Sequence, residues 1–298
     1  MSMATEWTAV FPPASTKVQV EFGAQSRKGA TRSINEDHYV IIRLGRNQET
    51  LLTSLPEDAL ASRFDEYGYA MVVADGMGGT GAGEAASRLA LATLVQLVLY
   101  FGKWNLRVDD GVARDIIARA ERFYRHVDAT MLSEGSSGPG ISLQTTMTAV
   151  FGAGRDLFFA HVGHSRAYLY RNDELMRLTR DHTIGMGSTS HVNLAPLVDV
   201  NVTARDLKHI LTETIGMSGA RGPRIDLERF HLEHDDVVLV CTNGLTDAVD
   251  EEAVANVLAS GRAPDDLCTM LVDAATKAGA EDDVTALVGR YRIPTVAG

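Results

Sequence analysis

The chain has 298 residues, 45% hydrophobic and 22% charged, which is enough apolar material for one large core or two modest domains. Its formal net charge of -11 excludes nucleic-acid binders that depend on phosphate contacts, because such proteins need a surplus of Lys and Arg. Cys241 and Cys268 lie far apart and predict buried, unpaired thiols in a reducing cytoplasm.

The ends and the longest apolar run argue against a membrane partner. The first residues lack the basic segment and apolar block of a signal peptide. Residues 89–101 are apolar except for Gln96 but fall short of the roughly 18 to 20 residues that cross a bilayer, so we predict a core helix there. We expect a cytoplasmic protein with a flexible N-terminal segment over 1–15 and a C-terminal tail over 294–298.

The first half of the chain reads as strands followed by helices. Alternating apolar and polar residues predict strands over residues 17–26, 37–45 and 67–76, with an acidic polar stretch over 46–66. Apolar residues then recur with the helical period over residues 83–101 and 110–132. We expect these two helices to pack against each other.

The second half begins with a predicted β-meander over residues 145–183, where turn-forming residues separate β-rich runs. The later elements are an irregular segment over 184–202, a helix over 203–216, a strand over 236–243, two helices within 250–278 and a strand over 284–292. Because regular strand–helix alternation is missing, this order favours two antiparallel sheets covered by helices over a doubly wound parallel sheet.

The segment VVADGMGGTGAGEAAS, residues 72–87, ends a buried strand on Asp75 and follows it with glycines. A buried carboxylate needs a metal or an arginine as partner. Alone, DGMGG also fits a turn whose Asp caps the next helix, but polar residues recur at other predicted strand ends: Asp37, His164 with Ser165, Asn243, and Asp282 with Asp283. If they converge, such oxygen ligands favour magnesium or manganese over zinc.

Six segments of the chain match the sequence motifs of a known family: GATRSINEDHYV, VVADGMGGTGAGEAAS, FAHVGHSRAYLYR, LTRDHT, VLVCTNGLTD and EDDVTALV. In order and spacing they resemble the motifs of the bacterial metal-dependent Ser/Thr protein phosphatases, the PPM or type 2C family. The resemblance runs from about residue 18 to residue 292 and predicts a single domain over 16–293. It implies an α+β fold, a four-layer α-β-β-α sandwich of two antiparallel sheets flanked by helix pairs.

The resemblance also implies a site with two cations, Mn²⁺ or Mg²⁺. Asp75 would bridge them, with Asp37 and the Gly76 carbonyl serving one cation and Asp282 and Asn243 the other. A water activated by the cations would attack phosphorus directly, without a phospho-enzyme.

Arg32, five residues before Asp37, matches the family's phosphate-binding arginine, so Arg32 and Asp75 are the expected catalytic residues. The alternative for Arg32 is a local capping or salt-bridge role.

Two positions depart from the family pattern, because Asn243 and His164 both stand where typical members have Asp. An Asn ligates through its amide oxygen without a charge, so we expect one cation to bind weakly. His164 stays open between a ligand of a third metal, a proton donor and a structural role. Asp283, where the family often has Asn, would restore some charge.

The expected function is a metal-dependent Ser/Thr phosphatase that acts, as a monomer, on phosphoproteins of a bacterial Ser/Thr kinase. The alternative is a pseudophosphatase, a phosphoprotein-binding or regulatory module with a degraded metal site. Asp181 and His182 are expected to brace the sheet edge, and Thr145 and Thr146 to support the metal ligands.

Overall fold

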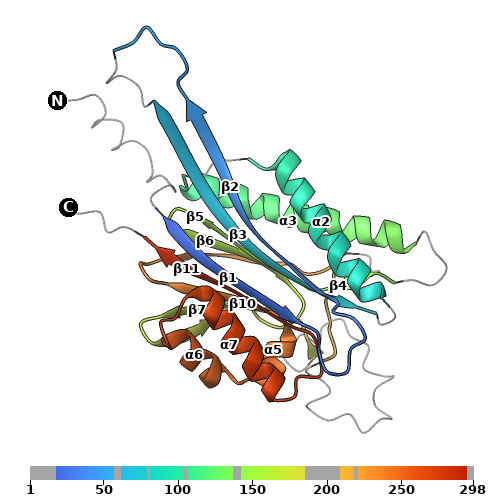
Figure 1. The fold of residues 1–298 in the computed structure, drawn as a ribbon. Helices are drawn as coiled ribbons and strands as arrows, with labels where there is room; N and C mark the ends of the chain where they lie inside the picture. The colour runs from blue at the N-terminus through green and yellow to red at the C-terminus, as the bar shows by residue number, and fades with distance from the viewer. Residues whose placement is uncertain are drawn as a thin grey trace.

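The computed structural model describes residues 18–56, 62–78, 81–103, 107–136, 142–184, 209–217 and 221–293. Two antiparallel sheets lie face to face, and helices cover both outer sides (Figure 1). This arrangement confirms the predicted α-β-β-α sandwich. The expected flexible ends, 1–15 and 294–298, lie outside the described residues, and the single domain over 16–293 stays a prediction.

The first sheet has five strands in the order β1-β11-β10-β7-β8. Their bounds are β1 (Gln19–Arg27), β7 (Arg166–Arg171), β8 (Glu174–Arg177), β10 (Val237–Cys241) and β11 (Val284–Arg292). The helices on its outer side are α5 (Asn243–Ala248), α6 (Glu251–Ala259) and α7 (Pro264–Lys277). Every residue of the central strand β10 is buried, because helices cover one face and the second sheet covers the other.

The second sheet runs in the order β2-β3-β5-β6-β9, and the short strand β4 pairs with β3. Its strands are β2 (Asp37–Glu49), β3 (Arg63–Met77), β4 (Gln144–Thr145), β5 (Met147–Ala153), β6 (Asp156–Val162) and β9 (Asp226–His231). The helices α2 (Ala82–Phe101) and α3 (Asp110–Gly135) cover its outer face and contact each other, as predicted.

Three apolar layers follow from this stacking. Side chains alternate between the two faces of a strand, so Val73 of β3 points between the sheets, whereas its neighbour Val72 points toward α2 and α3. The layer between the sheets also contains Leu157 and Leu287, and the layer under α7 contains Leu271. The core is therefore split by the sheets into one central and two outer layers.

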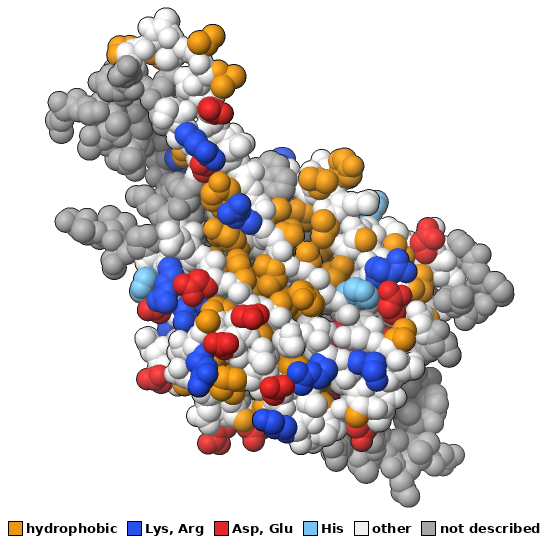
Figure 2. All heavy atoms as spheres, viewed as in Figure 1, with side chains coloured by type: hydrophobic (Ala, Val, Ile, Leu, Met, Phe, Trp, Pro, Cys, Tyr) orange, Lys and Arg blue, Asp and Glu red, His pale blue; other side chains and the backbone are white. Residues whose placement is uncertain are grey.

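The hairpin of β2 and β3 is longer than its sequence pattern indicated. Pairing continues to Glu49 and Arg63, so the expected polar stretch over 46–66 is strand at both ends. Charge pairing, rather than apolar alternation, holds this part together: the buried Glu66 carboxylate contacts Arg46 at 3.2 Å and Arg107 at 2.9 Å. Figure 2 shows hydrophobic side chains at the outer end of the hairpin, where three leucines are exposed: Leu51, Leu52 and Leu55.

The expected helix over 203–216 is wrong for residues 209–217, the part that the structure describes. This segment pairs with neighbouring backbone instead. Leu211 forms a bridge to Thr183, and Ile215 exchanges two backbone hydrogen bonds with Thr145, at 3.1 and 2.9 Å. The strand β9 and the short helix α5 were also not predicted.

Helix α2 is the one helix in the described residues that is long and apolar enough, by length and composition, to cross a membrane. It packs against β3 and α3 through buried residues that include Ala86, Ala90 and Leu94. The predicted core helix is therefore confirmed for most of its length. Its last turn differs, because Leu99, Tyr100 and Phe101 are between 64% and 73% exposed.

Both cysteines are free and buried, which confirms the expected unpaired thiols. Burial raises the pKa of each thiol to about 12, so neither is a reactive thiolate near neutral pH.

A buried histidine on β6 joins the sheet to the segment that follows β8. His161 is fully buried, and its Nε2 lies 3.0 Å from the Arg180 carbonyl oxygen, which can only accept. Its Nδ1 therefore accepts from the Thr148 hydroxyl at 2.8 Å. Burial, with the neighbouring His182, lowers the pKa of His161 to about 3.

We therefore predict that His161 makes stability fall with acidification. Because its pKa is lower in the folded state than its ordinary value, the unfolded chain gains a proton first, and stability is lost as the pH falls from about 6.5 toward 3. Urea unfolding at pH 7.5, 6.5 and 5.5 checks this. The free energy of unfolding should fall less steeply in His161→Gln than in the native chain. Equal slopes would contradict the prediction.

Candidate active site

Two buried carboxylates face each other where β2 begins and β3 ends. The strand register pairs Asp37 with Asp75, and the two residues are only 6% and 7% exposed. Directly paired residues have their Cβ atoms roughly 5 Å apart on one face of a sheet. Burial raises the pKa of Asp37 to about 7, and burial together with the charge of Asp37 raises that of Asp75 well above its ordinary value.

A chain of hydroxyl groups orients Asp37. Thr242 and Thr285 donate to its Oδ2 atom at 2.8 and 2.7 Å. Thr285 is in turn hydrogen-bonded to Ser26 at 2.8 Å, which accepts from Asn35. The Oδ1 atom of Asp37 is buried without a hydrogen-bond partner. One carboxylate oxygen is thus fixed by the fold, and the other is free to bind a ligand.

The backbone of Asp75 is held by β4 and the residue after it, as expected from the sequence. Thr145 Oγ1 and Thr146 N donate to the Asp75 carbonyl at 2.8 and 2.9 Å. Gly76 follows, and a Cβ atom there would lie 1.8 Å from the carbonyl oxygen of Gly83. Glycine is therefore required where the end of β3 touches the first turn of α2.

Arg32 and Asp282 form an ion pair at the edge of this site. Arg32 Nε and Nη2 both approach Asp282 Oδ1, at 2.8 and 2.7 Å, and Arg32 Nη1 lies 3.5 Å from Glu36. Against the lowering effect of burial, Asp282 raises the pKa of Arg32, and Asp75 adds a smaller contribution in the same direction as Asp282. The structure thus brings Arg32 into the predicted cluster and gives it the salt-bridge contact of the alternative interpretation.

Asp283 is bound to the backbone at the edge of the site. Its two carboxylate oxygens accept the backbone N–H groups of Gly29 and Glu36, at 2.8 and 2.7 Å, and the residue is 2% exposed. These bonds tie the segment that carries Arg32 to the start of β11. The Asp283 charge also adds to burial in raising the pKa of Asp37, and the suggested replacement of lost charge by Asp283 stays a prediction.

Asn243 is the first residue of α5, directly after Thr242. Its Nδ2 donates to Asp247 at 3.0 Å, so its amide oxygen points the other way, where it is buried without a partner. His209 Nδ1 lies 3.5 Å from the same Asp247 carboxylate. A Cβ atom on the next residue, Gly244, would lie 2.1 Å from the Asp283 carbonyl oxygen, so glycine permits the close approach of α5 to the turn before β11.

His164 lies beside Asp75. Its Nδ1 is 3.9 Å from Asp75 Oδ2, too far for a hydrogen bond, and is buried without a partner. Burial lowers the pKa of His164, partly offset by acidic groups of which Asp247 is the strongest. A neutral imidazole with a free ring nitrogen therefore faces the carboxylate pair.

Three of these residues have a buried atom without a hydrogen-bond partner, at the ends of different strands: Asp37, His164 and Asn243. Within the described ranges, no three His, Cys, Asp or Glu side chains form a compact metal-binding group. The three predicted carboxylate ligands are therefore not gathered into one compact group: Asp37 faces Asp75, whereas Asp282 is paired with Arg32.

Sequence reasoning missed several supporting residues. Glu36 is 4% exposed, and its carbonyl accepts from Gly76 N at 3.1 Å and from Ser87 Oγ at 2.6 Å. Thr242 and Thr285, which hold Asp37, stand next to the motif residues Asn243 and Val284. Both threonines lie inside the segments VLVCTNGLTD and EDDVTALV, and that position was the available signal. The other expected braces are present, since Asp181 pairs with Arg166 and His182 with Asp226.

The sequence relatives are bacterial phosphatases. The serine/threonine protein phosphatase PstP of Mycobacterium tuberculosis is 28% identical over 225 residues, which cover 73% of this chain but 39% of PstP. The serine/threonine phosphatase stp of Listeria innocua is 26% identical over 221 residues, which cover 73% of this chain and 82% of that protein. The chain thus spans well under half the length of PstP.

Solved structures share the fold. A Streptococcus agalactiae serine/threonine phosphatase superposes with a TM-score of 0.67 at 25% identity, covering 93% of this chain and all of that one. The catalytic domain of PstP in complex with 2 manganese ions has a TM-score of 0.66 at 24% identity and covers 92% and 99%. The family profile described as Protein phosphatase 2C matches residues 53–278. The chain therefore belongs to the protein phosphatase 2C family.

Proposed function

We propose that the chain is a metal-dependent protein serine/threonine phosphatase, which hydrolyses phosphoserine and phosphothreonine. The observation that carries the proposal is the buried Asp37–Asp75 pair with Arg32 beside it. Burial raises the pKa of both carboxylates, so ionising them is favourable only when a cation binds between them. A guanidinium at the edge of the pair suits a phosphate group. The phosphatase relatives support the same activity.

The residues present fit a hard divalent cation. Asp37 Oδ1 and Asn243 Oδ1 are buried oxygen atoms without hydrogen-bond partners, and Asp75 lies opposite Asp37. Oxygen donors of this kind suit Mn²⁺ or Mg²⁺. We assign Asp37, Asp75, the Gly76 carbonyl, Asn243 and Asp282 as ligands of two cations. The cation that Asn243 binds should be held more weakly, because the Asn243 amide carries no charge.

Each group of the chain then has a defined task. When bound, the cations supply a hydrolytic nucleophile near neutral pH and offset charge on the transferring phosphoryl group. Arg32 binds two phosphate oxygens through its planar guanidinium, which requires that it leave Asp282. Thr242 and Thr285 keep Asp37 in one orientation, so its free oxygen always faces the site. His164, neutral and unpartnered, lies where it can ligate a further cation or donate a proton.

The substrate is a phosphorylated protein, and we propose that a bacterial Ser/Thr kinase supplies it, because the relatives are bacterial Ser/Thr phosphatases. We also propose that the chain works in the cytoplasm as a monomer. The two buried free thiols support a reducing compartment.

A second candidate function is a pseudophosphatase that binds phosphoproteins without efficient turnover. Asn243 and His164 favour it, because both replace an acidic residue by a neutral one. The intact Asp37–Asp75 pair favours the enzyme, since a buried pair of carboxylates is costly to keep without a bound cation.

Turnover tests the enzyme directly. In saturating MnCl2, the native chain should hydrolyse p-nitrophenyl phosphate and a phosphothreonine peptide, and Asp75→Ala should lower kcat by about 100-fold or more, because it removes the proposed bridging ligand. Asp65→Ala is the matched control, since Asp65 lies on the same strand near its other end. Native turnover no higher than that of Asp75→Ala would refute the phosphatase.

Asp37→Asn should separate the effect of the Asp37 charge on stability from its effect on metal binding. In EDTA at pH 8 the variant should be more stable than the native chain, by about 1 kcal/mol, because ionised Asp37 is buried beside another carboxylate. The difference should shrink as the pH falls through about 7, where native Asp37 takes up its proton in the folded state. Addition of MnCl2 should raise the melting temperature of the native chain only.

Asp283→Asn is the control for that substitution, because it places an amide against two backbone donors and should destabilise by about 1–3 kcal/mol. Destabilisation by Asp37→Asn in EDTA would contradict the proposed charge pair.

Asn243→Asp should decide between the enzyme and the pseudophosphatase. A charged ligand should tighten Mn²⁺ binding by about 10-fold or more, measured by calorimetry. If the native chain is an enzyme, its turnover at saturating Mn²⁺ should already be substantial. If it is a pseudophosphatase, the double variant Asn243→Asp with His164→Asp should create turnover that the native chain lacks.

A further inference from the structure

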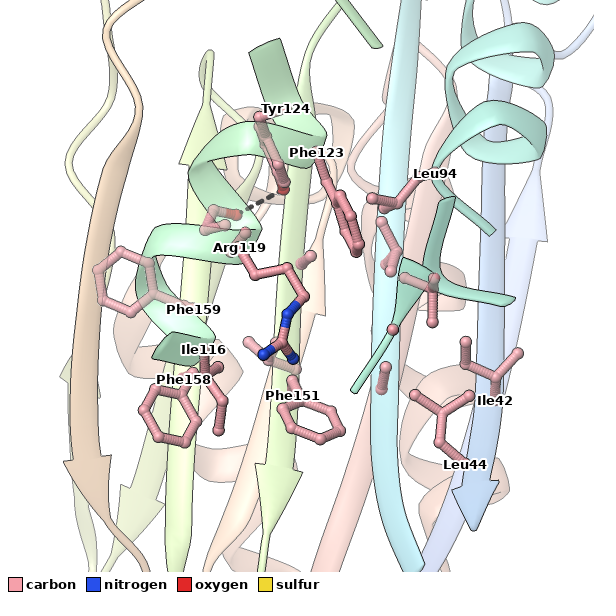
Figure 3. A pocket seen from close by; sticks show the side chains of 18 of the residues that line it. Ile42, Leu44, Leu94, Ile116, Arg119, Phe123, Tyr124, Phe151, Phe158 and Phe159 are labelled. Atoms are coloured by element: carbon pink, nitrogen blue, oxygen red, sulfur yellow. Dashed lines mark hydrogen bonds between the residues drawn. The ribbon is translucent and has the colours of Figure 1, made fainter. Parts of the chain in front are cut away.

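A cavity of about 140 Å³ lies between the second sheet and the helices α2 and α3, on the outer side of the sheet. Its walls are almost entirely apolar (Figure 3). A cavity of about this size, roughly 150 Å³, accepts a benzene molecule when it is lined by Leu, Ile and Phe. The space therefore suits an apolar group of about six carbons.

The cavity exists because the sheet has small side chains where the helices stand off from it. Two cross-strand rows form its floor. One row contains Val72, Ala149 and Ala160, and the next contains Ala70, Phe151 and Phe158. The three alanines leave room at the centre, and the large side chains of the two rows bound it.

One end of the cavity is closed and the other is open. Tyr124 and Leu94 line the closed end and are 1% and 7% exposed. Ile42, Leu44 and Phe151 line the other end and are only half-buried. A ligand can thus enter at the end where the long hairpin leaves the body of the molecule.

Two cations line this otherwise apolar space, Arg119 of α3 and Lys103 after α2. Figure 3 shows the Arg119 side chain extending from α3 into the cavity. Its Nη1 donates to the Lys103 carbonyl at 3.3 Å, and among the described residues neither side chain forms an ion pair. Partial burial, with a contribution from Arg122, lowers the pKa of Arg119, whereas Asp115 one turn earlier acts in the opposite direction.

A half-buried guanidinium without a paired anion, set in an apolar cavity, has the chemistry of a carboxylate receptor. We propose that this cavity binds a small amphipathic anion, a carboxylate whose chain of about six to eight carbons lies on the alanine floor and whose head group pairs with Arg119. The site is separate from the Asp37–Asp75 pair and does not depend on the proposed phosphatase activity.

Octanoate, used as dispersed monomer, is the probe. Calorimetry on the native chain in EDTA should give saturable binding of one octanoate per chain. Octan-1-ol should bind about 10-fold more weakly, because it lacks the charge that Arg119 pairs with, and octylammonium should not saturate. Use of metal-free protein keeps the carboxylate from binding at the proposed metal site, so the two proposals succeed or fail separately.

Matched variants locate the site. Arg119→Gln should weaken octanoate binding by about 10-fold and leave octan-1-ol unchanged. Arg114→Gln removes the same charge from an exposed position of the same helix outside the cavity lining and should change neither. Ala149→Leu fills the floor and should abolish binding of both ligands, with thermal unfolding to check that the variant folds.

Three results would overturn the proposal: no saturable octanoate binding to the native chain, equal affinity for octanoate and octan-1-ol, or equal octanoate affinity in Arg119→Gln and the native chain. The comparison of octanoate with octan-1-ol uses the native chain, and Arg119→Gln changes a partly exposed side chain. Neither result depends on whether Ala149→Leu folds.

Discussion

The pairing of Asp37 with Asp75 across β2 and β3 is the constraint on which the rest of the site depends. Both carboxylates are almost fully buried, and burial raises the pKa of each. Water cannot screen them, and the nearest guanidinium, that of Arg32, is already shared with Asp282. Without a bound cation the fold therefore favours protonation of the pair, and a bound cation can take the place of those protons.

Rigid supports around the pair prevent the chain from relaxing this cost. Thr242 and Thr285 fix one oxygen of Asp37, and Thr145 fixes the carbonyl of Asp75. Gly76 and Gly83 bring β3 and α2 so close that no side chain fits between them. These supports come from strands and helices of both sheets, so the geometry of the site is a property of the whole sandwich. The same elements, β2, β3 and α2, also contribute to the wall of the cavity under α3.

The sequence predicted the four layers and the site residues through different signals. Alternation located β1 and the helical period located α2 and α3, whereas β11 is buried on both faces along almost its whole length. These signals failed where other forces decide. The outer part of the β2–β3 hairpin is held by Glu66 with Arg46 and Arg107, which is a charge pattern rather than an apolar one. Residues 209–217 have helical composition, but the free edge at Thr183 and Thr145 binds their backbone.

The site residues were predictable as types but not as contacts. Polar residues at strand ends indicated a cluster, and the structure brings Asp37, Asp75, Arg32 and His164 together. No pattern in the sequence reveals that Asp283 accepts hydrogen bonds from two backbone N–H groups, or that the Asn243 Nδ2 donates to Asp247. Such assignments depend on which donors the fold places within about 3 Å of each oxygen, and that is a tertiary property.

The neutral residues at positions 164 and 243 affect both the affinity for metal and the stability of the metal-free chain. Asp282 is paired with Arg32 and Asp283 with the backbone, yet the charges of both add to burial in raising the pKa of Asp37 and Asp75. Carboxylates at positions 164 and 243 would add charge beside the same buried pair and increase their repulsion whenever the cations leave. The imidazole and the amide each leave one buried polar atom without a partner and add no charge in the metal-free chain. In the proposed site, uncharged groups at these positions would thus lower metal affinity and favour stability without metal.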